Sequence, residues 1–117
     1  DLGCWKEARN LRLFVKTSII SNIPNEEKYS LISQIIRSSR SVGNNITEGY
    51  GRYNFQENIQ FWRIARGSLF ENLDHAIIAL DEGYITQEIF DDLKDIHSKA
   101  LLILNGYIKY LKNQKLK

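Results

Sequence analysis

Apolar residues recur at intervals of three and four positions along four long segments of this chain, and this spacing restricts the possible folds more than any other feature. An α-helix has 3.6 residues per turn, so the pattern places apolar side chains on one face of each helix. It predicts helices over residues 4–20, 26–48, 55–82 and 87–113. Long helices with short connections favour an antiparallel arrangement. We therefore expect an all-α fold, a single four-helix bundle over residues 1–117 with up-down-up-down topology.

Residues with special backbone preferences indicate where these helices begin and end. Pro24 suits the first turn of the second helix, because its missing N–H would have no partner there in any case. Gly49 and Gly51 supply the permissive backbone that ends the same helix. Gly83 is expected to end the third helix, and Thr86 is positioned to cap the N-terminus of the fourth.

The last helix carries more apolar surface than a monomeric bundle requires. A first stripe keeps the spacing of four and three without interruption, and a second stripe lies beside it. The first comprises Ile89, Leu93, Ile96, Ala100, Ile103, Tyr107 and Tyr110, and the second comprises Leu101, Leu104, Ile108 and Leu111. Either the bundle is deeply packed at this helix, or the wide apolar face contacts another subunit.

Charge is unevenly distributed, although the net charge is only +2. Residues 99–117 contain five lysines and no Asp or Glu, whereas residues 54–98 contain nine acidic residues and three basic ones. In an up-down-up-down bundle the two termini and the second connection share one end. We therefore expect an acidic end with Glu26, Glu27, Asp81, Glu82, Glu88, Asp91 and Asp92, and a basic end with Lys6, Arg9, Arg52, Lys109, Lys112, Lys115 and Lys117.

A basic end of this kind is a candidate surface for the phosphate backbone of a nucleic acid. Tyr107 and Tyr110 offer rings for base stacking, but their regular spacing favours packing in the core. The alternative interpretation is that the lysine-rich C-terminus only increases solubility. The residues predicted to contact RNA or DNA are Arg40, Arg52, Lys109, Lys112, Lys115 and Lys117.

The second helix has a polar face opposite its apolar stripe. When the third helix folds back on the second, Glu71 comes opposite Arg37, and we expect an ion pair between them. Arg40, one turn away, then remains available to phosphate. Asn44 and Asn45 are unfavourable inside a helix and require compensation by bonds between helices or across a subunit interface. We predict a structural polar ladder or subunit interface of Gln34, Arg37, Asn44, Asn45, Glu48 and Glu71.

The sequence lacks the residue sets that catalysis and cofactor binding require. His75 and His97 are isolated from other metal-ligating residues, and no phosphate-binding loop, dinucleotide-binding motif or nucleophile elbow occurs. We expect no metal, no cofactor and no enzymatic activity. Cys4 is the single cysteine and suits a reducing compartment. No apolar run reaches the ~20 residues of a membrane span, so we predict a cytoplasmic protein without membrane contact.

Several stretches, taken together, resemble the bacterial four-helix-bundle proteins encoded in intervening sequences of 23S ribosomal RNA genes. The resemblance covers nearly the whole chain. It is carried by Trp5-x-x-Ala8, by Ile23-Pro24-x-x-Glu27-x-Tyr29-x-Leu31-x-x-Gln34-Ile35-x-Arg37, by Asn45-Ile46-x-Glu48-Gly49-x-Gly51-Arg52, by Ala65-x-Gly67-Ser68-Leu69-x-Glu71, and by Leu80-x-x-Gly83-Tyr84. Ile36, Gly43 and Thr47 depart from the family pattern, but Gly43 and Thr47 are small or short, so the expected fold stands.

This family is also similar to the accessory protein of diversity-generating retroelements, a basic, barrel-shaped homopentamer that works with a reverse transcriptase and nucleic acid. The resemblance implies a ring-like homo-oligomer, most simply a pentamer, with nucleic acid and a protein such as a reverse transcriptase as candidate partners. It implies no enzymatic activity. Together with the charge distribution, it favours a non-enzymatic oligomer that binds RNA or DNA backbone through basic surfaces. The alternative is a protein-interaction scaffold with no direct nucleic-acid contact.

Overall fold

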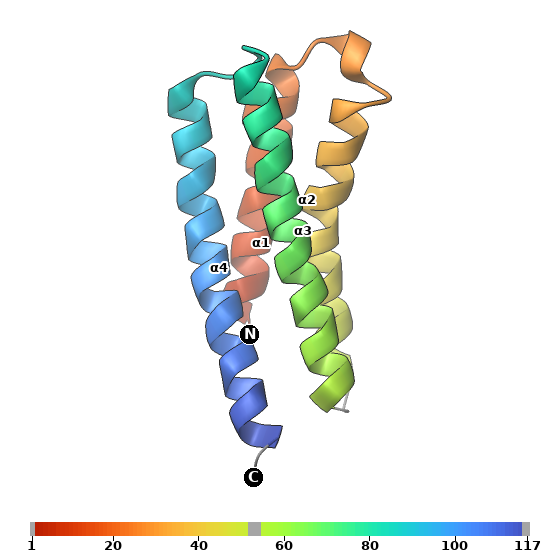
Figure 1. Ribbon diagram of the computed structural model, residues 1–117, viewed down its shortest axis with the longest axis vertical. Coiled ribbons are helices and arrows are strands. Elements are labelled where there is room, and N and C mark those ends of the chain that lie inside the picture. The colour runs from red at the N-terminus through yellow and green to blue at the C-terminus, as the bar shows by residue number, and fades with distance from the viewer. Residues whose placement is uncertain (1, 52–54, 116–117) are drawn as a thin grey trace.

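The computed structural model describes residues 2–51 and 55–115, which form four helices packed side by side along a common axis (Figure 1). The molecule measures 50 × 25 × 19 Å along its principal axes. All regular structure in the described residues is helical. The elements are α1 (Leu2–Phe14), the π-helix η1 (Val15–Ile19), the 3₁₀ turns η2 (Ile20–Asn22) and η3 (Asn25–Glu27), α2 (Leu31–Tyr50), α3 (Phe55–Asp81) and α4 (Gln87–Lys115).

The four helices alternate in direction, as the sequence pattern predicts. Helix α1 packs against α2 and α4, and α3 packs against the same two helices from the other side. Helices α1 and α3 therefore occupy one diagonal of the bundle, and α2 and α4 occupy the other (Figure 1). The connections over residues 23–30 and 82–86 lie at one end, α2 and α4 end at the opposite one, and α1 begins part-way along the bundle toward that opposite end.

The first helix continues past Phe14 as a π-helix because of the spacing of its apolar residues. Leu11, Val15, Ile19 and Ile23 follow one another at intervals of four, and each is buried. In an α-helix, repeated steps of four drift around the helix axis, because one turn holds only 3.6 residues. A π-helix holds more residues per turn. The wider turns of η1 thus keep Val15 and Ile19 in line with Leu11 on the core-facing side, and Ile23 follows after the turn η2 with extended backbone.

The second helix begins at Leu31, five residues later than predicted. Pro24 precedes a short 3₁₀ turn instead of an α-helix, and Ser30 has φ −122° and ψ −97°, outside the helical region. The Glu27 carboxylate accepts hydrogen bonds from the Ser30 hydroxyl and, at 3.1 Å, from the Tyr84 hydroxyl. These hydrogen bonds, with Ser30 first, hold the pKa of Glu27 below its ordinary value. The hydrogen bond between Glu27 and Tyr84 therefore links the segment before α2 to the α3–α4 connection.

The end of α2 also differs from the prediction, because Gly49 does not stop the helix. Helix α2 continues to Tyr50, and its C-cap Gly51 has φ −78°, which needs no glycine. Gly49 is buried, and a Cβ at this position would lie 2.6 Å from Nε1 of Trp62. Glycine is required here for a steric reason, because α2 and α3 approach each other closely. The backbone conformation alone would admit other residues.

The ends of α3 and α4 agree with the sequence prediction. Gly83 has φ +78°, and its N–H donates to the carbonyl of Leu80 at 3.0 Å. The N–H of Tyr84 donates to the carbonyl of Ala79 at 2.9 Å, which completes a Schellman motif. At the start of α4, the N–H of Ile89 donates to the Thr86 hydroxyl at 3.2 Å. Thr86 is therefore an N-cap, as expected.

The core-facing side of α4 is rotated relative to the predicted stripe. Of that stripe, only Leu93 and Ala100 are fully buried, whereas Ile89, Ile96, Ile103 and Tyr107 lie half-buried on a flank, and Tyr110 is 48% exposed. The wide apolar surface of this helix allows several rotations, and packing selects one of them. The buried residues are Phe90, Leu93, His97, Ala100, Leu104, Ile108 and Leu111.

Candidate nucleic-acid interface

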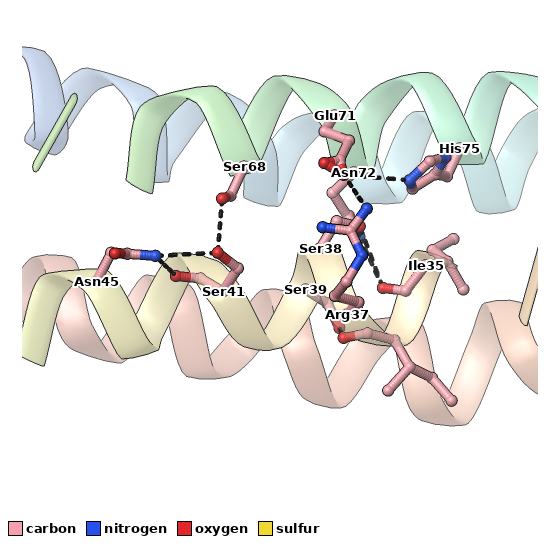
Figure 2. A network of polar contacts seen from close by, with 11 residues as sticks. Ile35, Arg37, Ser38, Ser39, Ser41, Asn45, Ser68, Glu71, Asn72 and His75 are labelled. Atoms are coloured by element: carbon pink, nitrogen blue, oxygen red, sulfur yellow. Dashed lines mark hydrogen bonds and ion pairs between the residues drawn. The ribbon is translucent and has the colours of Figure 1, made fainter. Parts of the chain in front are cut away.

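The α2–α3 interface contains the predicted ion pair. Nη2 of Arg37 donates to Oε2 of Glu71 at 2.6 Å (Figure 2). The same carboxylate oxygen lies 3.6 Å from Nε2 of His75, one turn further along α3. The Arg37 side chain is 64% exposed, so water weakens this pair. Arg37 is nonetheless committed to Glu71, and this helix face is a structural contact.

A second polar contact of the α2–α3 interface is fully buried and was not predicted from the sequence. Nδ2 of Asn72 donates to the Ser38 hydroxyl at 2.9 Å and to the carbonyl of Ile35 at 3.2 Å (Figure 2). Asn72 and Ser38 have no exposed surface. A signal was present in the sequence, because Asn72 interrupts the apolar stripe between Leu69 and Ala76. A polar residue at such a position indicates a buried partner on the neighbouring helix.

The two adjacent asparagines of α2 have different environments. Asn45 donates from Nδ2 to the carbonyl and the hydroxyl of Ser41, at 2.8 and 2.9 Å, and the Ser41 hydroxyl is 2.7 Å from that of Ser68 on α3 (Figure 2). Asn45 therefore belongs to the α2–α3 interface. Asn44 is exposed and makes no hydrogen bond with another described residue. Of the other predicted ladder residues, Gln34 and Glu48 are also exposed.

On the other side of α2, a groove between α1 and α2 collects positive charge. Arg9 and Arg12 approach it from α1, and Arg40 approaches it from α2. The groove has a volume of about 300 Å³, and Trp5 stands at its edge with 40% of its surface exposed. None of the described residues that line it is acidic, and the three arginines form no ion pair within the described part of the chain.

The remaining predicted cations lie elsewhere. Lys109 and Lys112 are exposed near the C-terminal end of α4. Lys115 is the last residue of that helix, and Arg52 and Lys117 lie outside the described residues, as does the Lys115 side chain. Because α2 and α4 are diagonal to each other, Arg40 belongs to a different surface from Lys109 and Lys112. The predicted set is therefore divided between two surfaces.

Aromatic rings gather near the basic end of the bundle. Trp62 is completely buried, and its ring centroid lies 4.2 Å from that of Tyr107 and 5.7 Å from that of Tyr50. Tyr107 is half-buried and packs on the core, as its spacing favours. Tyr110 lies 5.8 Å from Tyr107 and is half exposed, so the expectation that it packs in the core is wrong.

The buried histidine of α4 packs in the core of the bundle. His97 is 5% exposed, and its ring meets Phe70 edge-on at 5.3 Å between centroids. Burial lowers the pKa of His97, and a hydrogen bond with the backbone of Leu69 partly opposes this effect.

Among residues 2–51 and 55–115, no three His, Cys, Asp or Glu side chains come together as metal ligands would. No helix in the same ranges has the length and apolar character that a membrane crossing needs.

The family assignment follows from a match that covers most of the chain. The sequence profile of the 23S rRNA-intervening sequence protein family matches residues 1–106. The chain belongs to this family. The matched residues begin in α1 and end in the second half of α4, so the match includes all or part of every helix in the bundle.

The fold of this family member has a solved counterpart. A crystal structure from Bacteroides thetaiotaomicron, of a protein of unknown function from the S23 ribosomal protein family, superimposes with a TM-score of 0.80. The match covers 91% of this chain and 98% of that one at 22% sequence identity, so it establishes a shared fold. No curated protein sequence matches the chain.

Proposed function

We propose that this protein is a non-enzymatic, oligomeric binder of RNA or DNA that contacts the phosphate backbone through basic surfaces. The observation that carries the proposal is the separation of charge along the bundle. Exposed Lys109 and Lys112 lie near the C-terminal end of α4, and exposed Lys6 lies in the first turns of α1, whereas the opposite end of the bundle carries the acidic connections. A surface with one sign of charge attracts a polyanion and displaces its counterions.

The proposal is tested by binding to a generic structured RNA at two salt concentrations. We expect measurable affinity at low salt that decreases as salt rises, because counterion release drives the association. The double variant Lys109→Glu with Lys112→Glu should bind at least about tenfold more weakly at low salt. Its matched control is Lys94→Glu with Lys99→Glu, which makes the same charge change on exposed residues of the same helix. Absence of binding at low salt, or affinity independent of salt, would overturn the proposal.

Exposed apolar side chains on α3 and α4 support the oligomeric part of the proposal. Leu102 on α4 is 75% exposed, and Phe70 on α3 is 49% exposed. Phe70 shares a face of α3 with Ile77, two turns away and 38% exposed, and exposed apolar side chains on one face favour a protein–protein contact. A ring-like homopentamer is the assembly that the resemblance implies. Light scattering at micromolar concentration should give a mass several times that of one chain, and Leu102→Glu should reduce it. A monomeric mass for the unmodified protein contradicts self-association.

The same exposed apolar residues also favour the alternative function, a protein-interaction scaffold. In that case the basic residues would have no part in recognition. A protein partner that remains bound after nuclease treatment, together with unchanged partner binding in the Lys109→Glu, Lys112→Glu variant, would support the scaffold over nucleic-acid binding.

A further inference from the structure

We infer that the groove between α1 and α2 is a binding site for single-stranded nucleic acid, in which arginines hold phosphates and Trp5 stacks on a base. The inference rests on the proposed function and names the site that performs it. Arg40, the groove's cation on α2, lies on the helix diagonal to α4 and its lysines.

The arginines of the groove are arranged for an anion and not for a structural role. Arg9 and Arg12 are one turn apart on α1, where like charges repel. Arg40 approaches the same groove from α2 and adds a third positive charge. Arg37, one turn before Arg40, shows the structural alternative, because it is paired with Glu71. A phosphate among Arg9, Arg12 and Arg40 would accept forked hydrogen bonds and remove their mutual repulsion.

Small residues form the floor of the groove and keep it open. Ala8 and Gly43 face each other there, and a Cβ on Gly43 would lie 3.8 Å from that of Ala8, an ordinary contact. The hydroxyl of Ser39 is already bonded to the carbonyl of Ile36 at 2.9 Å. The polar group on the floor is thus satisfied, while Asn44 at the rim retains its donor and acceptor atoms for a ligand.

The exposed indole of Trp5 decides between possible ligands. A buried tryptophan such as Trp62 packs in the core, but Trp5 leaves 40% of its surface at the edge of a cationic groove. An aromatic side chain beside cations is the arrangement that binds unpaired bases, since each base offers a ring face for stacking. In a duplex the base faces are covered by neighbouring pairs. A single strand therefore fits the groove better than a duplex, because its phosphates meet the arginines while an unpaired base meets the indole.

The two tryptophans make the stacking step directly observable. Titration of the full-length protein with a short single-stranded oligonucleotide should quench the fluorescence of Trp5, while buried Trp62 contributes a constant signal. A Trp5→Phe variant should lose the quenching but keep most of its affinity, because phenylalanine still stacks. A Trp5→Ala variant should bind about tenfold more weakly. The matching duplex should give no quenching.

Charge and shape are tested separately by variants of the groove. Arg12→Gln and Arg40→Gln should each weaken single-strand binding about tenfold and reduce the slope of log affinity against log salt by about 0.7. Arg63→Gln, an exposed arginine on α3, which takes no part in the groove, is the control and should have little effect. Gly43→Leu keeps every cation but fills the groove, and should weaken binding as strongly. Gly67→Leu, at an open surface position, should not.

The possible results separate this inference from the broader proposal. If the unmodified protein binds no nucleic acid, the proposed function fails, and the site fails with it. If it binds, but Arg12→Gln, Arg40→Gln and Gly43→Leu behave like their controls, only the site is overturned. Equal quenching by a duplex overturns the single-strand preference. Quenching by an acidic peptide, with no response to oligonucleotides, identifies the groove as a peptide site and overturns the inference.

Discussion

Gly49→Ala is the substitution for which the structure gives the most specific expectation. An added Cβ would lie 2.6 Å from Nε1 and 2.7 Å from Cδ1 of Trp62, distances that require something to move. Trp62 has no exposed surface and is packed against Tyr50 and Tyr107, so it has no space to move into. Overpacking of this kind costs about 1–3 kcal/mol. Alanine in a helix interior regains about 0.8–1 kcal/mol relative to glycine.

The expected net effect is therefore a loss of up to about 2 kcal/mol in the free energy of unfolding, and a deficit of about 1–3 kcal/mol relative to an alanine substitution at an open helical position. Gly67→Ala and Gly106→Ala are matched controls, because both positions are helical and a Cβ there meets nothing within 4 Å. These controls should gain up to about 1 kcal/mol from helix propensity alone. Urea unfolding followed by circular dichroism, at one protein concentration throughout, measures all three. If Gly49→Ala is as stable as Gly106→Ala, the close approach of α2 to Trp62 is refuted.

Three further predictions concern polar groups. A double-mutant cycle on Arg37 and Glu71 should give a coupling below about 1 kcal/mol that decreases with salt, since Arg37 is 64% exposed; a larger, salt-independent value would contradict this. Asn72→Asp should cost about 3–5 kcal/mol at pH 7, because it buries an unpaired charge, and less at pH 4; a loss under 1 kcal/mol at pH 7 would show that the site is open to water. Because burial lowers the pKa of His97, its contribution to stability should be complete above about pH 6.5 and lost as the pH falls through its folded-state pKa. His97→Phe should remove this part of the pH dependence of unfolding, and an unchanged profile would assign it to another group.

Interactions within a helix or its caps were largely predictable from sequence. The Schellman motif at Gly83 and the N-cap at Thr86 depend on a few consecutive residues, and both formed as expected. The Arg37–Glu71 pair was also predictable, because the short α2–α3 connection limits the register between these two antiparallel helices. The buried contact of Asn72 with Ser38 also has a local signal, a polar residue within an apolar stripe.

The start of α2 was not predictable in this way. Pro24, Glu26 and Glu27 are all favourable in the first turn of a helix, and local preference therefore placed the helix start at residue 26. In the structure the Glu27 carboxylate instead binds the hydroxyls of Ser30 and Tyr84, and Tyr84 lies more than fifty residues further along the chain. A partner so distant in sequence leaves no local signal.

The sequence alone determined the number, order and direction of the helices, because the 3.6-residue period and the short connections admit few other arrangements. Only the tertiary structure decided how each helix is rotated about its axis. Helix α4 has apolar residues over a wide arc, so the periodic pattern left the buried line undefined, and packing placed Leu104 and Ile108 in the core while Tyr110 remained exposed. The same rotations bring Arg9, Arg12 and Arg40 to one groove, and Arg40 lies on the helix diagonal to the one that carries Lys109 and Lys112. Charges on different helices form a common surface only through packing, which a one-dimensional pattern does not record.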